Sequence, residues 1–168
     1  VQWGFTDPEV TLIDRRGRVV VRPMSIESGY LPETELDALR EESPEAVALA
    51  DVLKVAVMHR VTDTYGPIAY LSIGSSGIQQ EYDPQEVIYT RFFEELDAAI
   101  TLLTDFYEKN PSATLLANYD PIYKGNVRAW VKFANTLRLR LAMRVYYADR
   151  ELSKAQAEAA INNSVGLM

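Results

Sequence analysis

The chain has 168 residues, enough for one domain with a substantial core, and its 48% hydrophobic and 24% charged content is that of a globular protein. Its formal net charge of −7 argues against nucleic-acid binding and against docking on an anionic lipid surface, because both depend on basic residues. The absence of cysteine excludes disulfides, thiolate metal sites, iron–sulfur clusters and cysteine nucleophiles.

The first part of the chain is predicted to be mostly non-helical. Residues 10–13 and 18–21 are short β-prone runs on either side of a basic turn that contains Gly17, a pattern that predicts a small β-hairpin. Pro and Gly residues punctuate the segment that follows. A short polar helix is expected over residues 33–42.

The first long helix is predicted to start after Ser43, with Ser43 as the N-cap and Pro44 at the first helical position. The segment 46–58 is apolar almost all round, which is typical of a central helix packed on several sides. We expect this helix to end between residues 62 and 65, before Gly66.

A second long helix is predicted after a Gly/Ser-containing loop. Asp83 is expected to be its N-cap and Pro84 its first helical residue. Apolar side chains then recur at helical spacing, at Ile88, Phe92, Leu96, Ile100, Leu103 and Tyr107. Glu94 and Glu95 lie on the opposite face and are predicted to face solvent.

The third long helix is predicted over residues 127–145. Its apolar stripe consists of Val127, Trp130, Ala134, Leu137, Leu141 and Val145. Trp130 is therefore predicted to be a core residue. Asp149 is expected to cap a last, alanine-rich helix that ends near Asn162.

The order of these elements predicts an all-α fold of antiparallel helix pairs with long loops, a scaffold like that of tetratricopeptide repeats. We assign residues 1–168 to a single domain, with a variable loop and hairpin region over 1–43 and the helical scaffold over 44–168. No apolar run is long enough to span a bilayer. The chain starts at Val1 without a leader and ends in apolar residues after Gly166, so we expect it to be part of a longer protein.

The sequence contains no constellation that indicates catalysis. His59 is the only histidine and is predicted to be structural, and the Gly74–Gly77 segment lacks the Lys-Ser/Thr of a phosphate loop. Glu94 and Glu95 are adjacent on a helix, so they point in different directions and cannot flank a glycosidic bond as an acid and nucleophile pair. We therefore expect no enzyme activity, no metal site and no cofactor.

Three arginines in the third helix require an explanation. Arg140 and Arg144 are one turn apart, a like-charge spacing that is mildly unfavourable by itself. We favour ion pairs with acids of the preceding helix, such as Asp97 or Glu94, for these residues and Arg138. A solvated face and an anion-binding surface are the alternatives.

Aromatic residues in irregular segments are the best candidates for ligand binding. The chain has ten tyrosines, two tryptophans and five phenylalanines, and aromatic rings stack well on the apolar face of sugars. Loops carry binding residues more often than helix interiors do. We therefore select Trp3, Phe5, Tyr70 and Tyr82 as candidate ligand contacts, with local packing as the alternative for each.

Three ordered motifs suggest a family. MHRVTDTYGPIAY at residues 58–70 is followed by YDPQEVIYTRFFEELDAAITLL at 82–103 and DPIYKGNVRAWVKFANTLRLRLAMRV at 120–145, and then by an acid- and alanine-containing helix that ends in GLM. In this order they resemble the SusD/RagB family, in particular its SusD-like branch. The resemblance covers residues 47–168. Residues 1–44 match nothing that we can align.

The resemblance implies a nutrient-binding protein that is exported and lipid-anchored at the outer-membrane surface of Bacteroidetes-type bacteria. Such proteins cap a TonB-dependent outer-membrane transporter and help to capture glycans or peptides, with no catalysis. The helical half forms the scaffold and contacts the transporter; the lipid-anchored cysteine and the large second half of family members are absent from this chain. The alternative function is a helical-repeat adaptor that binds a protein partner and no nutrient.

Overall fold

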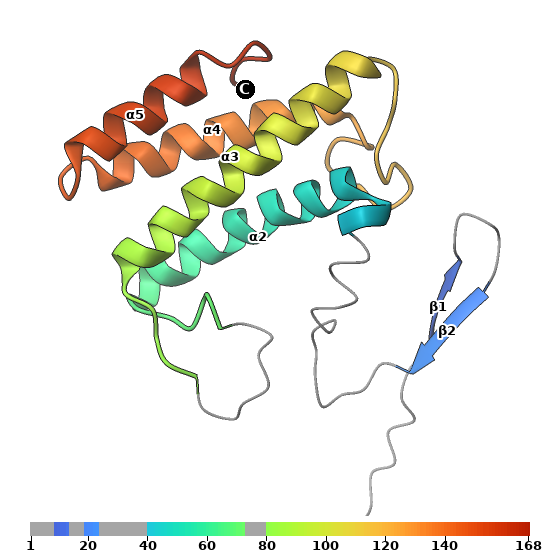
Figure 1. Cartoon of the computed structure of the whole chain (residues 1–168), viewed down its shortest axis with the longest axis horizontal. Coiled ribbons are helices and arrows are strands. Elements are labelled where there is room, and N and C mark those ends of the chain that lie inside the picture. Colours follow the sequence, from blue (N-terminus) through green and yellow to red (C-terminus); the bar gives the residue numbers. More distant parts are fainter. Residues whose placement is uncertain (1–8, 14–18, 24–39, 73–79) are drawn as a thin grey trace, which may run out of the picture.

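The structure, a computed structural model, describes residues 9–13, 19–23, 40–72 and 80–168. Within these residues it contains one two-stranded antiparallel sheet and four long helices, and residues 40–42 are also helical. The elements (Figure 1) are β1 (Glu9–Ile13), β2 (Val19–Pro23), α2 (Pro44–Tyr65), α3 (Gln85–Lys109), α4 (Val127–Val145) and α5 (Arg150–Ile161). The predicted all-α fold and the N-terminal hairpin are both confirmed.

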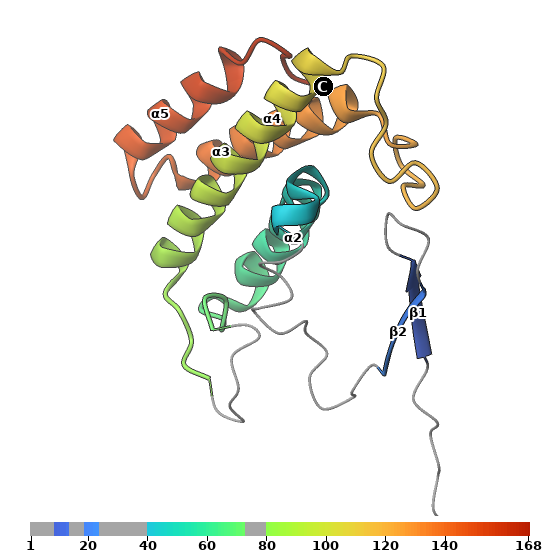
Figure 2. The ribbon, with the colours of Figure 1, turned by 45° about the vertical axis from the view of Figure 1, so that its right-hand side comes forward.

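Successive helices pack against one another in chain order. Helix α2 lies against α3, α3 against α4, and α4 against α5, as Figures 1 and 2 show. Each connection reverses the direction of the chain, so the helices form two antiparallel pairs, α2 with α3 and α4 with α5. This is the tetratricopeptide-like arrangement that the sequence predicts.

The hydrophobic core lies between the helices and has α3 at its centre. The predicted stripe of α3 is buried over most of its length, with Ile88, Phe92 and Leu96 fully inside. The same core takes in side chains from both neighbouring helices: Val52 and Val55 of α2, and Trp130, Val131, Ala134 and Leu141 of α4. The prediction that Trp130 is a core residue is therefore confirmed.

Helix α2 is not the central helix that its composition predicts. One side of α2 packs on the core, and His59 on that side is buried with Nδ1 3.1 Å from the carbonyl oxygen of Val55. The other side exposes Leu53 and Val57, and the side chain of Val57 is 60% exposed. The prediction is wrong because, among the described residues, α3 and part of α4 cover α2 on one side and leave part of its apolar surface exposed.

Of the three predicted N-cap positions, two are confirmed and one is not. Helix α2 begins at Pro44 after Ser43, and Asp149 caps α5 by accepting a hydrogen bond from the amide of Leu152 at 2.9 Å. Helix α3, however, begins at Gln85 with Pro84 at the N-cap position. Asp83 is therefore not the N-cap, because its carboxylate binds two amides of the preceding loop instead.

The hairpin pairs Ile13 with Val19 and Glu9 with Pro23. Its predicted turn lies outside the described residues. So does most of the short helix expected over residues 33–42, of which only residues 40–42 are described.

Replacing Leu137 of α4 with Ala is expected to lower the free energy of unfolding by about 2–5 kcal/mol, since the side chain is buried in the core and its removal leaves a cavity. Met143→Ala, at an exposed position of the same helix, is the control and is expected to change stability by less than about 0.5 kcal/mol. Urea denaturation of both variants checks the packing of α4, and equal losses would contradict it.

Candidate functional site

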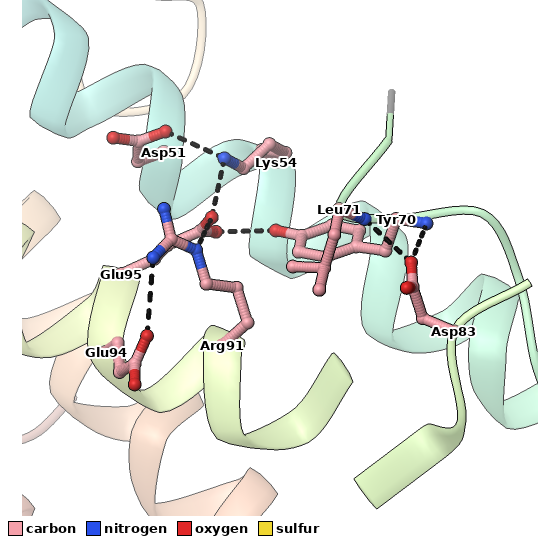
Figure 3. Close-up of polar contacts among 8 residues, drawn as sticks. All are labelled: Asp51, Lys54, Tyr70, Leu71, Asp83, Arg91, Glu94 and Glu95. Atoms are coloured by element: carbon pink, nitrogen blue, oxygen red, sulfur yellow. Dashed lines mark hydrogen bonds and ion pairs between the residues drawn. The ribbon is translucent and has the colours of Figure 1, made fainter. Parts of the chain in front are cut away.

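The loop that joins α2 to α3 is closed by hydrogen bonds between its two ends, which we call the loop base (residues 66–72 and 80–84). The amide of Asp83 donates to the carbonyl oxygen of Ile68 at 2.8 Å. The Asp83 carboxylate accepts from the amides of Tyr70 and Leu71, both at 2.8 Å (Figure 3). One side chain thus holds together chain segments that are more than ten residues apart.

The end of α2 sets the direction in which the chain enters this loop. Gly66 has a φ of 79°, which favours glycine, and its amide donates to the carbonyl oxygen of Thr62 at 2.8 Å. The Thr62 hydroxyl donates to the Gly66 carbonyl at 2.7 Å, and Gln85 Nε2 donates to the Thr62 carbonyl at 2.7 Å. The Thr-x-x-x-Gly spacing of the motif therefore terminates the helix and ties its end to the start of α3.

Glu95 is the centre of a polar cluster that anchors the loop base to the helices (Figure 3). Its side chain is only 9% exposed, and it accepts a hydrogen bond from the hydroxyl of Tyr70 at 2.5 Å. Lys54 Nζ of α2 and Arg91 Nε of α3 each lie 3.0 Å from Glu95 Oε1. The prediction that Glu94 and Glu95 both face solvent is wrong for Glu95, whose partners come from three separate segments.

Burial and the hydrogen bond to Glu95 keep Tyr70 protonated. Burial, and then the hydrogen bond to Glu95, raise the pKa of the Tyr70 hydroxyl well above its usual range. Lys54 also lies 5.7 Å from the centre of the Tyr70 ring and 3.0 Å from Asp51. The Tyr70 hydroxyl is therefore a permanent donor to the Glu95 carboxylate.

The two candidate ligand residues that the structure describes, Tyr70 and Tyr82, differ in their exposure to solvent. Tyr70 is 6% exposed, and its ring packs edge-on against Phe92 at 5.0 Å, so its geometry is that of an anchor. Tyr82, two residues before Pro84, is 73% exposed. Trp3 and Phe5 lie outside the described residues. Ligand contact by these residues remains a prediction, which the geometry favours for Tyr82.

Two arginines of α4 form ion pairs with acidic residues of other helices. Arg138 pairs with Asp97 of α3 at 2.9 Å, as predicted, and its Nε donates to Gln156 of α5 at 2.7 Å. Arg144 pairs instead with Asp63 of α2 at 2.8 Å. Arg140 is exposed, and the predicted partner Glu94 pairs with an arginine of its own helix.

Asp63 joins three helices at the end of the bundle that carries the loop base. Besides Arg144 of α4, it accepts a hydrogen bond from the Tyr89 hydroxyl of α3 at 2.6 Å. Burial, followed by this bond, raises the pKa of Tyr89 to about 12. The C-terminal ends of α2 and α4 and the N-terminal end of α3 meet here. Four exposed tyrosines lie at or next to these ends: Tyr65, Tyr82, Tyr146 and Tyr147. We call this end the aromatic end.

The opposite end of the bundle carries the loop between α3 and α4, which is built around Asp120. Its buried carboxylate accepts from the amides of Ile122, Tyr123 and Gly125 at 2.9, 3.1 and 2.8 Å, and from Trp130 Nε1 at 2.7 Å. Burial opposes ionisation, but these donors outweigh it and lower the pKa of Asp120 to about 2.

Gly125 completes this loop because no other residue fits its position. It has a φ of 78°, and a Cβ there would lie 2.6 Å from the carbonyl oxygen of Leu115. We did not predict the role of Asp120 from the sequence. The signal was present, since a buried Trp130 needs an acceptor for its indole N–H and an Asp-Pro pair with a following glycine is typical of a tight loop.

The described residues offer anchored loops and exposed side chains. They contain no group of three or more His, Asp or Glu residues placed to hold a metal ion. Within the described part of the chain, no helix is sufficiently long and apolar to cross a membrane. The fold and its loop anchors define a helical-repeat scaffold of the tetratricopeptide-like class.

The chain belongs to the SusD-like family, described as SusD and RagB outer membrane lipoproteins, whose sequence profile matches residues 27–168. The match begins before residue 47, where the resemblance in the sequence starts, so it includes part of the segment that we could not align. No curated protein matches the chain.

Solved structures of SusD homologues share the fold. A chitin-binding SusD homologue from Flavobacterium johnsoniae is 43% identical with a TM-score of 0.73, over 77% of this chain and 27% of that one. A SusD homologue from Bacteroides uniformis is 44% identical with a TM-score of 0.71, over 80% of this chain and 28% of that one. The chain therefore spans about a quarter of the length of these relatives.

Replacing Asp120 with Asn is expected to lower the free energy of unfolding by about 2 kcal/mol at pH 7, because the amide has one acceptor oxygen and turns an NH₂ group toward buried donors. The folded pKa lies below the unfolded value, so the carboxylate stabilises the fold at neutral pH and loses this effect as the pH falls from about 4 to 2.

Denaturation of both proteins from pH 7 to pH 2 measures the difference between them, which should shrink on acidification. Asp105→Asn, at an exposed position, is the control. A difference that stays constant down to pH 2 would show that ionisation of Asp120 is not its source.

Proposed function

We propose that the protein to which this chain belongs binds glycans at the outer surface of the bacterial cell, without catalysis, and that chitin oligosaccharides are among its ligands. The observation that carries this proposal is the 43% identity, at a TM-score of 0.73, to a SusD homologue that binds chitin. Peptides are the second class of ligand that the family resemblance implies.

Within this chain, the aromatic end is the part that we assign to ligand contact. Tyr82 is an exposed residue of the loop base, and the hydrogen bonds of Asp83 fix the backbone next to it. An exposed ring on fixed backbone can stack on a pyranose with a smaller loss of entropy. Trp3 and Phe5 are retained as further candidates from the sequence.

We further propose that the full-length protein is held at the outer membrane by a lipid anchor and works with a TonB-dependent transporter. The description of the family as outer membrane lipoproteins supports the location. In this arrangement residues 44–168 form the scaffold and residues 1–43 a variable region of the same domain.

The alternative function is that of a helical-repeat adaptor without nutrient binding. The exposed apolar side of α2, with Leu53 and Val57, is the observation that favours it. Purification of the tagged full-length protein from detergent-solubilised outer membrane, followed by mass spectrometry, separates the two functions. A large TonB-dependent barrel among the bound proteins supports the importer function, and a soluble partner without a barrel supports the adaptor.

Replacing Tyr82 with Ala is expected to weaken binding of chitohexaose to the full-length protein by up to about tenfold. A stacking contact of an aromatic ring contributes up to about 1.5 kcal/mol, and tenfold corresponds to about 1.4 kcal/mol. The melting temperature should not change, because the side chain is exposed. Isothermal titration calorimetry and a thermal melt provide the two measurements.

Tyr119→Ala is the matched control, since Tyr119 is 84% exposed in the loop at the opposite end of the bundle. It should leave binding unchanged, and Tyr82→Phe should retain most of it. Equal affinities of the Tyr82→Ala variant and the wild type would remove Tyr82 from the ligand site.

A further inference from the structure

Tyr82 is connected to the helical core through a short series of side-chain bonds. Its neighbour Asp83 is bound to the other end of the loop by three hydrogen bonds, one from its own amide to Ile68 and two to its carboxylate from the amides of Tyr70 and Leu71. Since all three bonds are 2.8 Å long, residue 83 and the segment 68–71 are held at a fixed distance.

The segment 68–71 is in turn attached to the helices through Tyr70. The Tyr70 hydroxyl donates to Glu95 (Figure 3). The Tyr70 ring packs on Phe92, so both the polar and the apolar part of the side chain are held. Glu95 is fixed between Lys54 of α2 and Arg91 of α3. The bonds therefore run from α2 and α3 through Tyr70 to Asp83, next to Tyr82.

We infer that Asp83 and Glu95 are positioning residues for ligand binding, which hold the backbone beside Tyr82 in place before the ligand arrives. The inference rests on the proposed function, because it assumes that Tyr82 contacts a glycan. Neither carboxylate touches the ligand in this scheme: Asp83 accepts hydrogen bonds from two backbone amides, and Glu95 accepts one from the Tyr70 hydroxyl.

The physical effect is a smaller loss of conformational entropy on binding. Loose backbone beside the ring must be ordered when the sugar binds, whereas backbone that is already fixed does not add this cost to that of ordering the side chain. Loss of either carboxylate is therefore expected to weaken binding about three- to tenfold through a less favourable binding entropy, with the contacts to the sugar unchanged.

The test uses the full-length protein with Asp83→Asn and Glu95→Gln, and chitohexaose as the ligand. Both replacements keep the shape of the side chain, and Lys54 and Arg91 are partly exposed, so water can solvate the cations that Glu95 leaves. Glu94→Gln is the control, because Glu94 is exposed and its pairing is with Arg91 of the same helix.

Two measurements are made on each variant. Hydrogen exchange of the peptide that contains the Tyr70 and Leu71 amides reports on the loop base without any ligand, and should be faster in Asp83→Asn than in the wild type. Calorimetry should show about three- to tenfold weaker binding for both variants. The Glu94→Gln control should bind as tightly as the wild type. In a Tyr82→Ala background, Asp83→Asn should weaken binding no further.

Each unfavourable result has a distinct meaning. Binding that is unchanged in Asp83→Asn and Glu95→Gln, or that is weakened equally in the Tyr82→Ala background, overturns the positioning role and leaves glycan binding intact. Unchanged hydrogen exchange in Asp83→Asn overturns the positioning role for that residue as well. A wild-type protein that does not bind chitohexaose overturns the proposed function for chitin and, with it, the positioning role for this ligand.

Discussion

Burial of α3 on two sides is the constraint on which the rest of the structure depends. Its apolar stripe fills the space between α2 and α4, and the edges of that stripe carry charges that select the neighbours: Glu95 pairs with Lys54 of α2, and Asp97 pairs with Arg138 of α4. Arg138 is itself buried, so leaving it without a carboxylate would be costly. The apolar surface supplies most of the stabilisation, and the ion pairs fix which side of each neighbour faces α3.

The loop base at one end of the bundle and the Asp120 loop at the other are held by the same kind of interaction, a carboxylate that accepts several hydrogen bonds from main-chain amides. Asp120 binds three amides and the indole of Trp130, and Asp83 binds two amides across the base of the other loop. A carboxylate is suited to this role because its two oxygens accept up to four hydrogen bonds and its charge strengthens each of them. Chain segments without regular structure thus obtain the partners that helices find within themselves.

Most of the helical scaffold could be predicted from the sequence, because helical periodicity and capping residues are local signals. The stripes of α3 and α4, the core position of Trp130 and the cap at Asp149 all depend on residues a few positions apart. The features that could not be predicted depend on residues far apart in the chain. Asp83 has the right residue type and place for an N-cap, but the amides of Tyr70 and Leu71 compete for its carboxylate. Glu95 looks like a surface charge until Lys54 and Tyr70 are brought to it.

The anchors also explain how one scaffold can support different binding surfaces. Asp83 and Asp120 bind mainly to backbone amides, which every residue except proline possesses, so the loop geometry does not depend on the side chains displayed beside them. Tyr82 next to Asp83 and Tyr119 next to Asp120 are both exposed and can be exchanged without removing a bond of the anchor. The interactions that hold the described ends of a loop are therefore separate from the side chains that it exposes. The exposed side chains can therefore change while the helical core and its carboxylates stay the same.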